Sequence, residues 1–167
     1  EHGYVQNIIT TNFDPLIDKI LENIPHRKIV GELTSELGDN PKMTFIKAHG
    51  DLKYGNLRFS PFELQKLPAE LENKIRQLTK GIVIVVGYRG QDIGIMNSLN
   101  TSDDHCAFWV SPTKPEIYDG YTNDPIYDWM KKRNSEGNFI YGEYGDFNIL
   151  FPTLVRKLSA LPNETFK

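Results

Sequence analysis

The sequence predicts an α/β fold in which helices cover a mostly parallel, Rossmann-like sheet in three layers. Residues 81–87 (GIVIVVG) hold five consecutive branched aliphatic side chains between glycines. Such a run is typical of a strand that is buried on both faces of a parallel sheet. Strand-like and helix-like segments alternate along the chain, as they do in strand–helix–strand units. A length of 167 residues fits one domain, and we expect it to span residues 1–167.

Further strands are expected where apolar and β-branched residues cluster. The clearest segments are 5–11 (VQNIITT), 43–48 (MTFIKA) and 106–110 (CAFWV), and shorter ones lie at 28–30 and 138–141.

Helices are expected where apolar residues recur three or four positions apart. Such patterns cover residues 16–24, 64–78, 126–133 and 147–161. Pro25 should end the first, Pro68 should break the second in two, and Pro152 lies near the first turn of the last. Residues 111–125 form a long, loop-rich connection.

The composition excludes several classes of protein. The chain has 19 basic and 22 acidic residues, for a net charge of −3, and no basic stripe, so direct binding of nucleic acid is not expected. A single cysteine, Cys106, cannot build a zinc site of several thiolates, and we expect no zinc. No apolar run approaches the roughly 20 residues that span a bilayer, so we expect a cytoplasmic protein without a membrane partner.

Polar and glycine residues directly follow four of the predicted strands. They are residues 10–14 (TTNFD), 49–51 (HGD), 87–92 (GYRGQD) and 111–112 (SP). In open α/β sheets, ligands bind beyond the carboxyl ends of the strands, so these residues should converge on one edge. Each group also has a structural interpretation: Asn12 and Asp14 as helix caps, His49 as a turn residue, and residues 87–92 as a turn before a helix.

Taken in order, the segments TTNFD, KAHGDL, VVGYRGQD and FWVSP resemble the sirtuin-like NAD-binding family over residues 8–112. Within this family, the sequence resembles more specifically the zinc-free branch found in prokaryotic defence proteins and NTPase-linked proteins. It implies NAD as the substrate and a sirtuin-like sheet. Sirtuins also carry a first strand with a G-A-G-x-S loop, and this sequence contains no such loop. We therefore expect the chain to be the C-terminal portion of a larger domain, and inactive as a fragment.

The resemblance also implies roles for six residues. Asn12 would lie by the nicotinamide ribose and orient a water or a ribose hydroxyl, and His49 would act as the general base. We expect these two catalytic side chains to face one cleft within roughly 10 Å of each other. Asp92 begins a helix in the family and is not expected to be catalytic. The residues expected to bind NAD are Thr11, Asp14, Gly87 and Tyr88.

The function that the resemblance implies is hydrolysis of NAD to nicotinamide and ADP-ribose by the intact parent protein, in anti-phage defence. NAD or ADP-ribose, other domains of the parent and a homo-oligomer are the expected partners. One alternative is a catalytically inert module that binds a nucleotide or serves regulation and assembly. Protein deacylation is disfavoured, because the zinc module that frames the peptide groove in sirtuins is missing.

Overall fold

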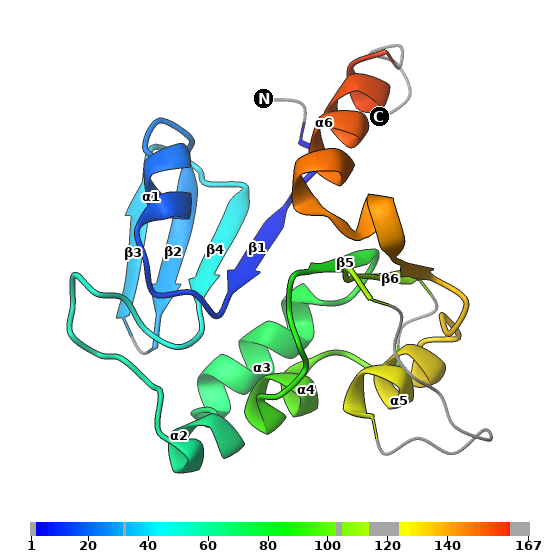
Figure 1. Cartoon of the computed structure of the whole chain (residues 1–167). Coiled ribbons are helices and arrows are strands. Elements are labelled where there is room, and N and C mark those ends of the chain that lie inside the picture. The colour runs from blue at the N-terminus through cyan, green and yellow to red at the C-terminus, as the bar shows by residue number, and fades with distance from the viewer. Residues whose placement is uncertain (1–2, 32, 103–104, 114–123, 161–167) are drawn as a thin grey trace. The chain divides into compact units, whose positions relative to one another are not determined.

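A computed structural model describes residues 3–31, 33–102, 105–113 and 124–160, and the chain divides into two units. The first comprises Glu1–Thr79 and Gln91–Asn100, and the second comprises Lys80–Gly90 and Thr101–Lys167. Each unit contains its own sheet and its own helices (Figure 1). The prediction of one domain over residues 1–167 stays a prediction.

The first unit is built on a four-stranded mixed sheet in the order β1-β4-β2-β3. β1 (Asn7–Thr10), β4 (Met43–Lys47) and β2 (His26–Val30) run parallel, as their apolar and β-branched residues predict. β3 (Leu33–Leu37) pairs antiparallel with β2 and was not predicted. Its sequence, LTSEL, lacks the alternation of apolar and polar residues that marks a half-buried strand, and all five of its side chains are exposed.

The helices of the first unit are α1 (Leu16–Ile20), α2 (Pro61–Gln65), α3 (Ala69–Leu78) and α4 (Ile93–Ser98). The predicted break at Pro68 is confirmed, because Pro68 separates α2 from α3. The segment expected to be helical up to residue 24 stops at Ile20. Phe45 and Ile46 of β4 and Ile75 of α3 are fully buried and belong to the core of this unit.

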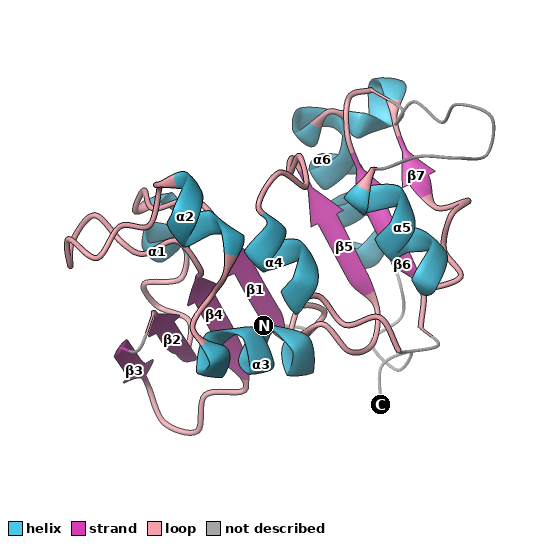
Figure 2. Ribbon diagram, turned by 90° about the horizontal axis from the view of Figure 1, so that it is seen from below, coloured by secondary structure: helices cyan, strands magenta, loops and turns pink. Residues whose placement is uncertain are grey.

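The second unit contains a parallel sheet in the order β5-β6-β7 (Figure 2), formed by Val83–Val86, Ala107–Val110 and Phe139–Ile140. Its helices are α5 (Pro125–Lys132), the short 3₁₀ helix η1 (Gly142–Gly145) and α6 (Phe147–Ser159), which accommodates Pro152. β5 was expected to be buried on both faces, and this was wrong. Ile84 is 53% exposed, because strand side chains alternate between the two faces of a sheet and the face that carries Ile84 is not covered.

The predicted α/β class is confirmed by these two sheets and their helices. Most of the loop-rich connection expected at 111–125 lies outside the described residues. No helix in the described part of the chain is both long enough and apolar enough to cross a bilayer.

Candidate functional site

The register between β1 and β4 brings the first two motifs to the same edge of the first unit's sheet. Thr10 is paired with Lys47 at the ends of the two parallel strands. Asn12 and His49 each follow their paired residue by two positions. Neighbouring strands lie about 4.8 Å apart, so the two residues leave the sheet beside each other. Their side-chain separation within one cleft stays a prediction.

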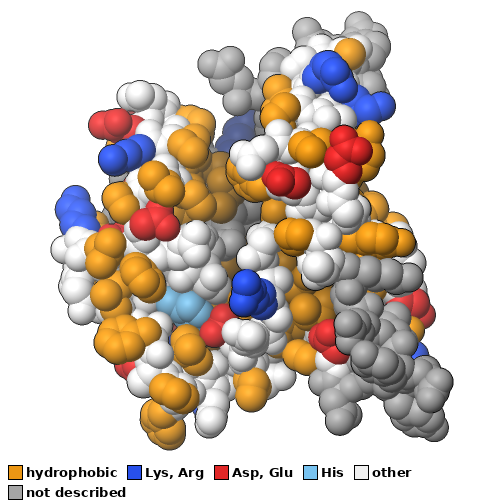
Figure 3. Space-filling view, in the orientation of Figure 1, with side chains coloured by type: hydrophobic (Ala, Val, Ile, Leu, Met, Phe, Trp, Pro, Cys, Tyr) orange, Lys and Arg blue, Asp and Glu red, His pale blue; other side chains and the backbone are white. Residues whose placement is uncertain are grey.

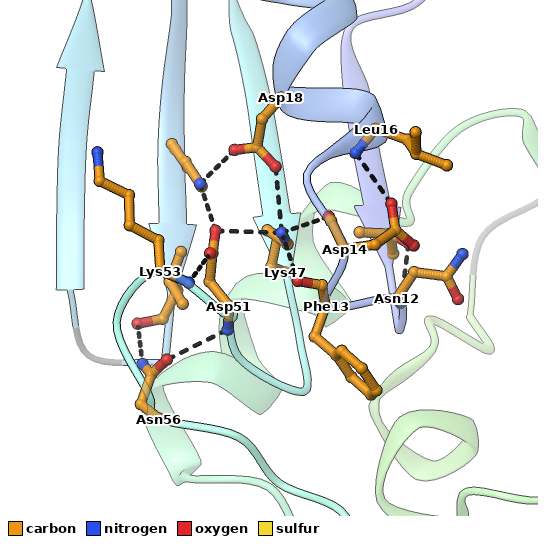
Figure 4. A network of polar contacts seen from close by, with 12 residues as sticks. Asn12, Phe13, Asp14, Leu16, Asp18, Lys47, Asp51, Lys53 and Asn56 are labelled. Carbon is orange, nitrogen blue, oxygen red and sulfur yellow. Dashed lines mark hydrogen bonds and ion pairs between the residues drawn. The ribbon is translucent and has the colours of Figure 1, made fainter.

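The loops that carry these residues are also bonded to each other. The amide of Ala48 donates to the Thr10 carbonyl at 2.9 Å, and the amide of Leu52 donates to the Phe13 carbonyl at 3.2 Å. The Lys47 ammonium donates to the same Phe13 carbonyl at 3.2 Å and to the Asp14 carbonyl at 2.7 Å (Figure 4). Backbone amides and one ammonium group therefore hold the TTNFD loop against the KAHGDL loop.

Within the TTNFD loop the side chains differ in their local bonding. Oδ1 of Asp14 accepts a hydrogen bond of 2.9 Å from the Leu16 amide at the start of α1. This bond satisfies an amide at the start of α1, so the structural interpretation of Asp14 accounts for Oδ1 of its carboxylate. Asn12 is exposed, and its backbone amide donates to Oγ1 of Thr10 at 3.0 Å (Figure 4). Thr11 directly precedes Asn12 and is half-buried.

His49 is buried, and a carboxylate lies beside its imidazole. Oδ2 of Asp92 is 3.4 Å from Nε2 of His49, and the Asp92 side chain is 16% exposed. Nδ1 of His49 is also buried and has no hydrogen-bond partner in the part of the chain that the structure describes. Nε2 is likewise buried without a hydrogen-bond partner among the described residues, so its contact with Asp92 is a close approach and not a hydrogen bond.

Asp92 lies beside the predicted base, although the sequence-based interpretation did not include it among the site residues. It occupies the N-cap position of α4, as its role at a helix start predicts, but its side chain makes no capping hydrogen bond there. Its carboxylate instead lies against His49, which is 43 residues earlier in the chain. No local pattern signals this pairing, because it depends on how α4 packs in the first unit.

Two lysines and two aspartates form a network beside the motif loops, in which Lys47 and Asp51 are buried and Lys28 and Asp18 are half-buried. Lys28 and Lys47 come from β2 and β4, Asp18 from α1, and Asp51 from the loop after His49. Lys28 bonds to Asp18 and lies 2.6 Å from Oδ2 of Asp51. Lys47 lies 3.1 Å from both carboxylates (Figure 4). Two positive and two negative charges balance, which is the condition for burying such groups.

The pKa values of the network follow from this pairing. Burial acts to raise the pKa of Asp51, but hydrogen bonds from Lys28 and from the Lys53 amide outweigh it and lower the pKa from 3.8 to about 2. Burial likewise acts to raise the pKa of Asp18, and the bonds from the two lysines lower it overall. Both carboxylates are therefore ionised at neutral pH, and the network is held in its charged form.

Gly50 has a steric role in the KAHGDL loop. Its φ is +95°, and a Cβ built on it would lie 2.0 Å from the carbonyl oxygen of Asn56. The loop closes tightly at this point, since the amide of Arg58 donates to the His49 carbonyl at 2.9 Å. Only glycine permits both this backbone conformation and this approach, which explains why glycine follows the histidine.

Gly87 and Tyr88, the remaining residues predicted to bind NAD, belong to the second unit. They follow β5 directly, as predicted, and the amide of Gly87 donates to the Val110 carbonyl at 3.3 Å. The Tyr88 ring packs on Trp109 with centroids 6.0 Å apart. These contacts fix the turn within its own unit, and the role of the two residues toward NAD stays a prediction.

Other features of the described part of the chain include a cavity that lies apart from the predicted site residues. The cavity has a volume of about 440 Å³, is lined by residues of β2, β3 and α3, and includes none of the predicted site residues. Figure 3 shows basic and acidic side chains scattered among hydrophobic ones. The exposed hydrophobic side chains of the first unit include Leu16 and Ile20 of α1 and Phe62 of α2. Among the described residues, no group of three or more His, Cys, Asp or Glu side chains could hold a metal ion.

Comparison with known families identifies the family to which the chain is similar. The model of the SIR2-like domain matches residues 6–115, which include every residue predicted to be catalytic or to bind NAD. No curated protein sequence matches the chain. The match covers well over half of the 167 residues. An NAD-related function is the general property that this family suggests. The chain belongs to the SIR2-like domain family.

Proposed function

We propose that this chain supplies catalytic residues for the hydrolysis of NAD to nicotinamide and ADP-ribose in the full-length protein. The observation that supports the proposal is the register of β1 and β4, in which Thr10 pairs with Lys47 and each of these residues precedes one predicted catalytic residue by two positions. Asn12 and His49 are the two residues that the resemblance assigns to the reaction, at the positions where its motifs carry them.

The chemistry suits these side chains. Cleavage of the bond between nicotinamide and the ribose builds positive charge on the anomeric carbon, and nicotinamide leaves with the bonding electron pair as a neutral molecule. The oxygen of a water molecule then bonds to that carbon, and its proton passes to a base. The neutral amide of Asn12 would orient the water or a ribose hydroxyl, and the imidazole of His49 would accept the proton.

Asp92 has a part in this proposal as a positioning residue. Its carboxylate beside Nε2 of His49 would fix the orientation of the imidazole and stabilise the cation that forms when the ring takes up a proton. Thr11, Asp14, Gly87 and Tyr88 would bind the dinucleotide, and no zinc is required for this reaction.

The test is nicotinamide release from NAD, measured on the full-length protein and on this 167-residue chain. Asn12→Ala and His49→Ala should each abolish release. His26→Ala is the matched control for His49, because it removes another buried imidazole from the same sheet. Asn97→Ala, at an exposed position of α4, is the control for Asn12.

The two controls should retain activity. A folded, assembled full-length protein that binds NAD but releases no nicotinamide would contradict the proposal and favour a binding or regulatory module. Release that survives His49→Ala would contradict the assignment of the base. Release of nicotinamide only when an acylated peptide is present would favour a deacylase.

The resemblance places this reaction in prokaryotic anti-phage defence, and we include that setting in the proposal. Bacteria that express the full-length protein should lose cellular NAD after phage infection and should limit phage growth. Cells that express the Asn12→Ala variant should keep both their NAD and their sensitivity to phage.

A further inference from the structure

We propose that Lys47 is a positioning residue, which holds the TTNFD loop in place for the reaction by binding the backbone carbonyls of Phe13 and Asp14. The proposal rests on the proposed NAD hydrolysis for its activity readout only. Its structural part concerns how the first unit fixes Asn12, and it can be tested whether or not the protein hydrolyses NAD.

The burial of Lys47 is the first step of the argument. Its side chain is 0% exposed, and it lies at the end of β4, directly after the buried Phe45 and Ile46. A buried ammonium is costly unless each of its protons is bonded. Here its partners are two carboxylates and two backbone carbonyls, so the site is built around this charge.

The identity of the two carbonyls is the second step. They belong to Phe13 and Asp14, the residues that directly follow Asn12 (Figure 4). Lys47 itself lies at the end of β4, two residues before His49. One ammonium group thus connects the backbone that carries the predicted amide to the strand that leads to the predicted base. Its aliphatic stem is buried, which makes it a rigid anchor for an exposed loop.

Lys28 makes the matched comparison possible. It is the other cation of the network and bonds to the same two carboxylates, and those bonds do not involve the loop carbonyls. Substituting either lysine by methionine removes one positive charge and leaves a network of one cation and two anions. Only Lys47→Met also removes the bonds to Phe13 and Asp14.

The first measurement is hydrogen exchange of the backbone amides in the full chain. In Lys47→Met, the amides of Asn12, Phe13, Asp14 and Leu16 should exchange about tenfold faster or more, and so should the Leu52 amide, which shares the Phe13 carbonyl. In Lys28→Met the same amides should stay within about threefold of the unsubstituted chain. Equal acceleration in both variants would overturn the proposal, because the loop would then depend on the charge balance alone.

The second measurement is kcat for nicotinamide release by the full-length protein. Lys47→Met should lower kcat by about ten- to a hundredfold, the loss expected when a reacting group is displaced by about 1 Å. Lys28→Met should leave kcat within about threefold of its original value. A Lys47→Met variant with full kcat would overturn the proposal.

A charge-balanced variant covers the case in which Lys47→Met folds poorly. The double substitution Lys47→Met, Asp18→Asn leaves one cation and one anion, Lys28 and Asp51, and Asp18→Asn alone serves as its control. The double variant should regain thermal stability but not kcat, and its loop amides should still exchange quickly. Recovery of kcat would refute positioning through the carbonyls. If the unsubstituted full-length protein releases no nicotinamide, the proposed function fails, while the exchange measurement still decides the role of Lys47.

Discussion

The glycine of the KAHGDL loop allows a sharp test of the loop geometry. Gly50 and Gly55 lie in the same loop and both have positive φ, +95° and +65°. An alanine Cβ at position 50 would lie 2.0 Å from the Asn56 carbonyl oxygen, whereas no atom lies within 4 Å of a Cβ at position 55. The two Gly→Ala substitutions therefore share a conformational cost and differ in a steric one.

The expected magnitudes follow from these two terms. The left-handed conformation costs about 1–2 kcal/mol for a residue with a Cβ, which is the whole effect at Gly55. Overpacking adds about 1–3 kcal/mol at Gly50, for a total of about 2–5 kcal/mol. In a chain of this size each kcal/mol lowers Tm by about 2–4 °C. Gly50→Ala should thus be clearly the more damaging substitution.

The assay is guanidinium unfolding of the two variants, followed by far-UV circular dichroism. Both tryptophans, Trp109 and Trp129, belong to the second unit, so their fluorescence reports on that unit and provides an internal reference. Equal free energies of unfolding for the two variants would refute the reasoning, because the Asn56 carbonyl would then move away from position 50 without cost.

Three further predictions concern the network, the imidazole and a helix cap. The pKa of Asp51 is lower in the folded chain, about 2 against 3.8, so its ionisation adds stability above pH about 4 that is lost as the pH falls toward 2. This loss, about 2 kcal/mol, should be absent from urea unfolding curves of Asp51→Asn at low pH. Asp92→Asn should lower kcat for nicotinamide release by about tenfold or more, whereas Asn97→Ala, at an exposed position of the same helix, should leave kcat unchanged; a full kcat in Asp92→Asn would show that its carboxylate does not position the imidazole. Ser60→Ala removes the capping box that Ser60 forms with Glu63 at the start of α2, and should cost about 1 kcal/mol in thermal unfolding. An unchanged Tm would show that α2 does not need this cap.

Local patterns in the sequence determined most of the secondary structure. The strands at β1, β4, β5 and β6 follow from runs of apolar and β-branched residues, and the break at Pro68 follows from the chemistry of proline. These signals are local, because a strand or a helix end depends on residues that are near each other in the chain. The motifs TTNFD, KAHGDL and VVGYRGQD are local in the same sense, which is why the sequence alone was enough to select their residues.

Tertiary structure decided how those pieces meet. β3 exists because β2 supplies a partner for a polar segment, and Ile84 is exposed because its face of the sheet is not covered. The pairing of Asp92 with His49 depends on the packing of α4, and the burial of Lys47 depends on carboxylates contributed by a helix and a loop. Charged partners that are distant in the sequence leave no periodic signal, so only the folded chain could reveal them.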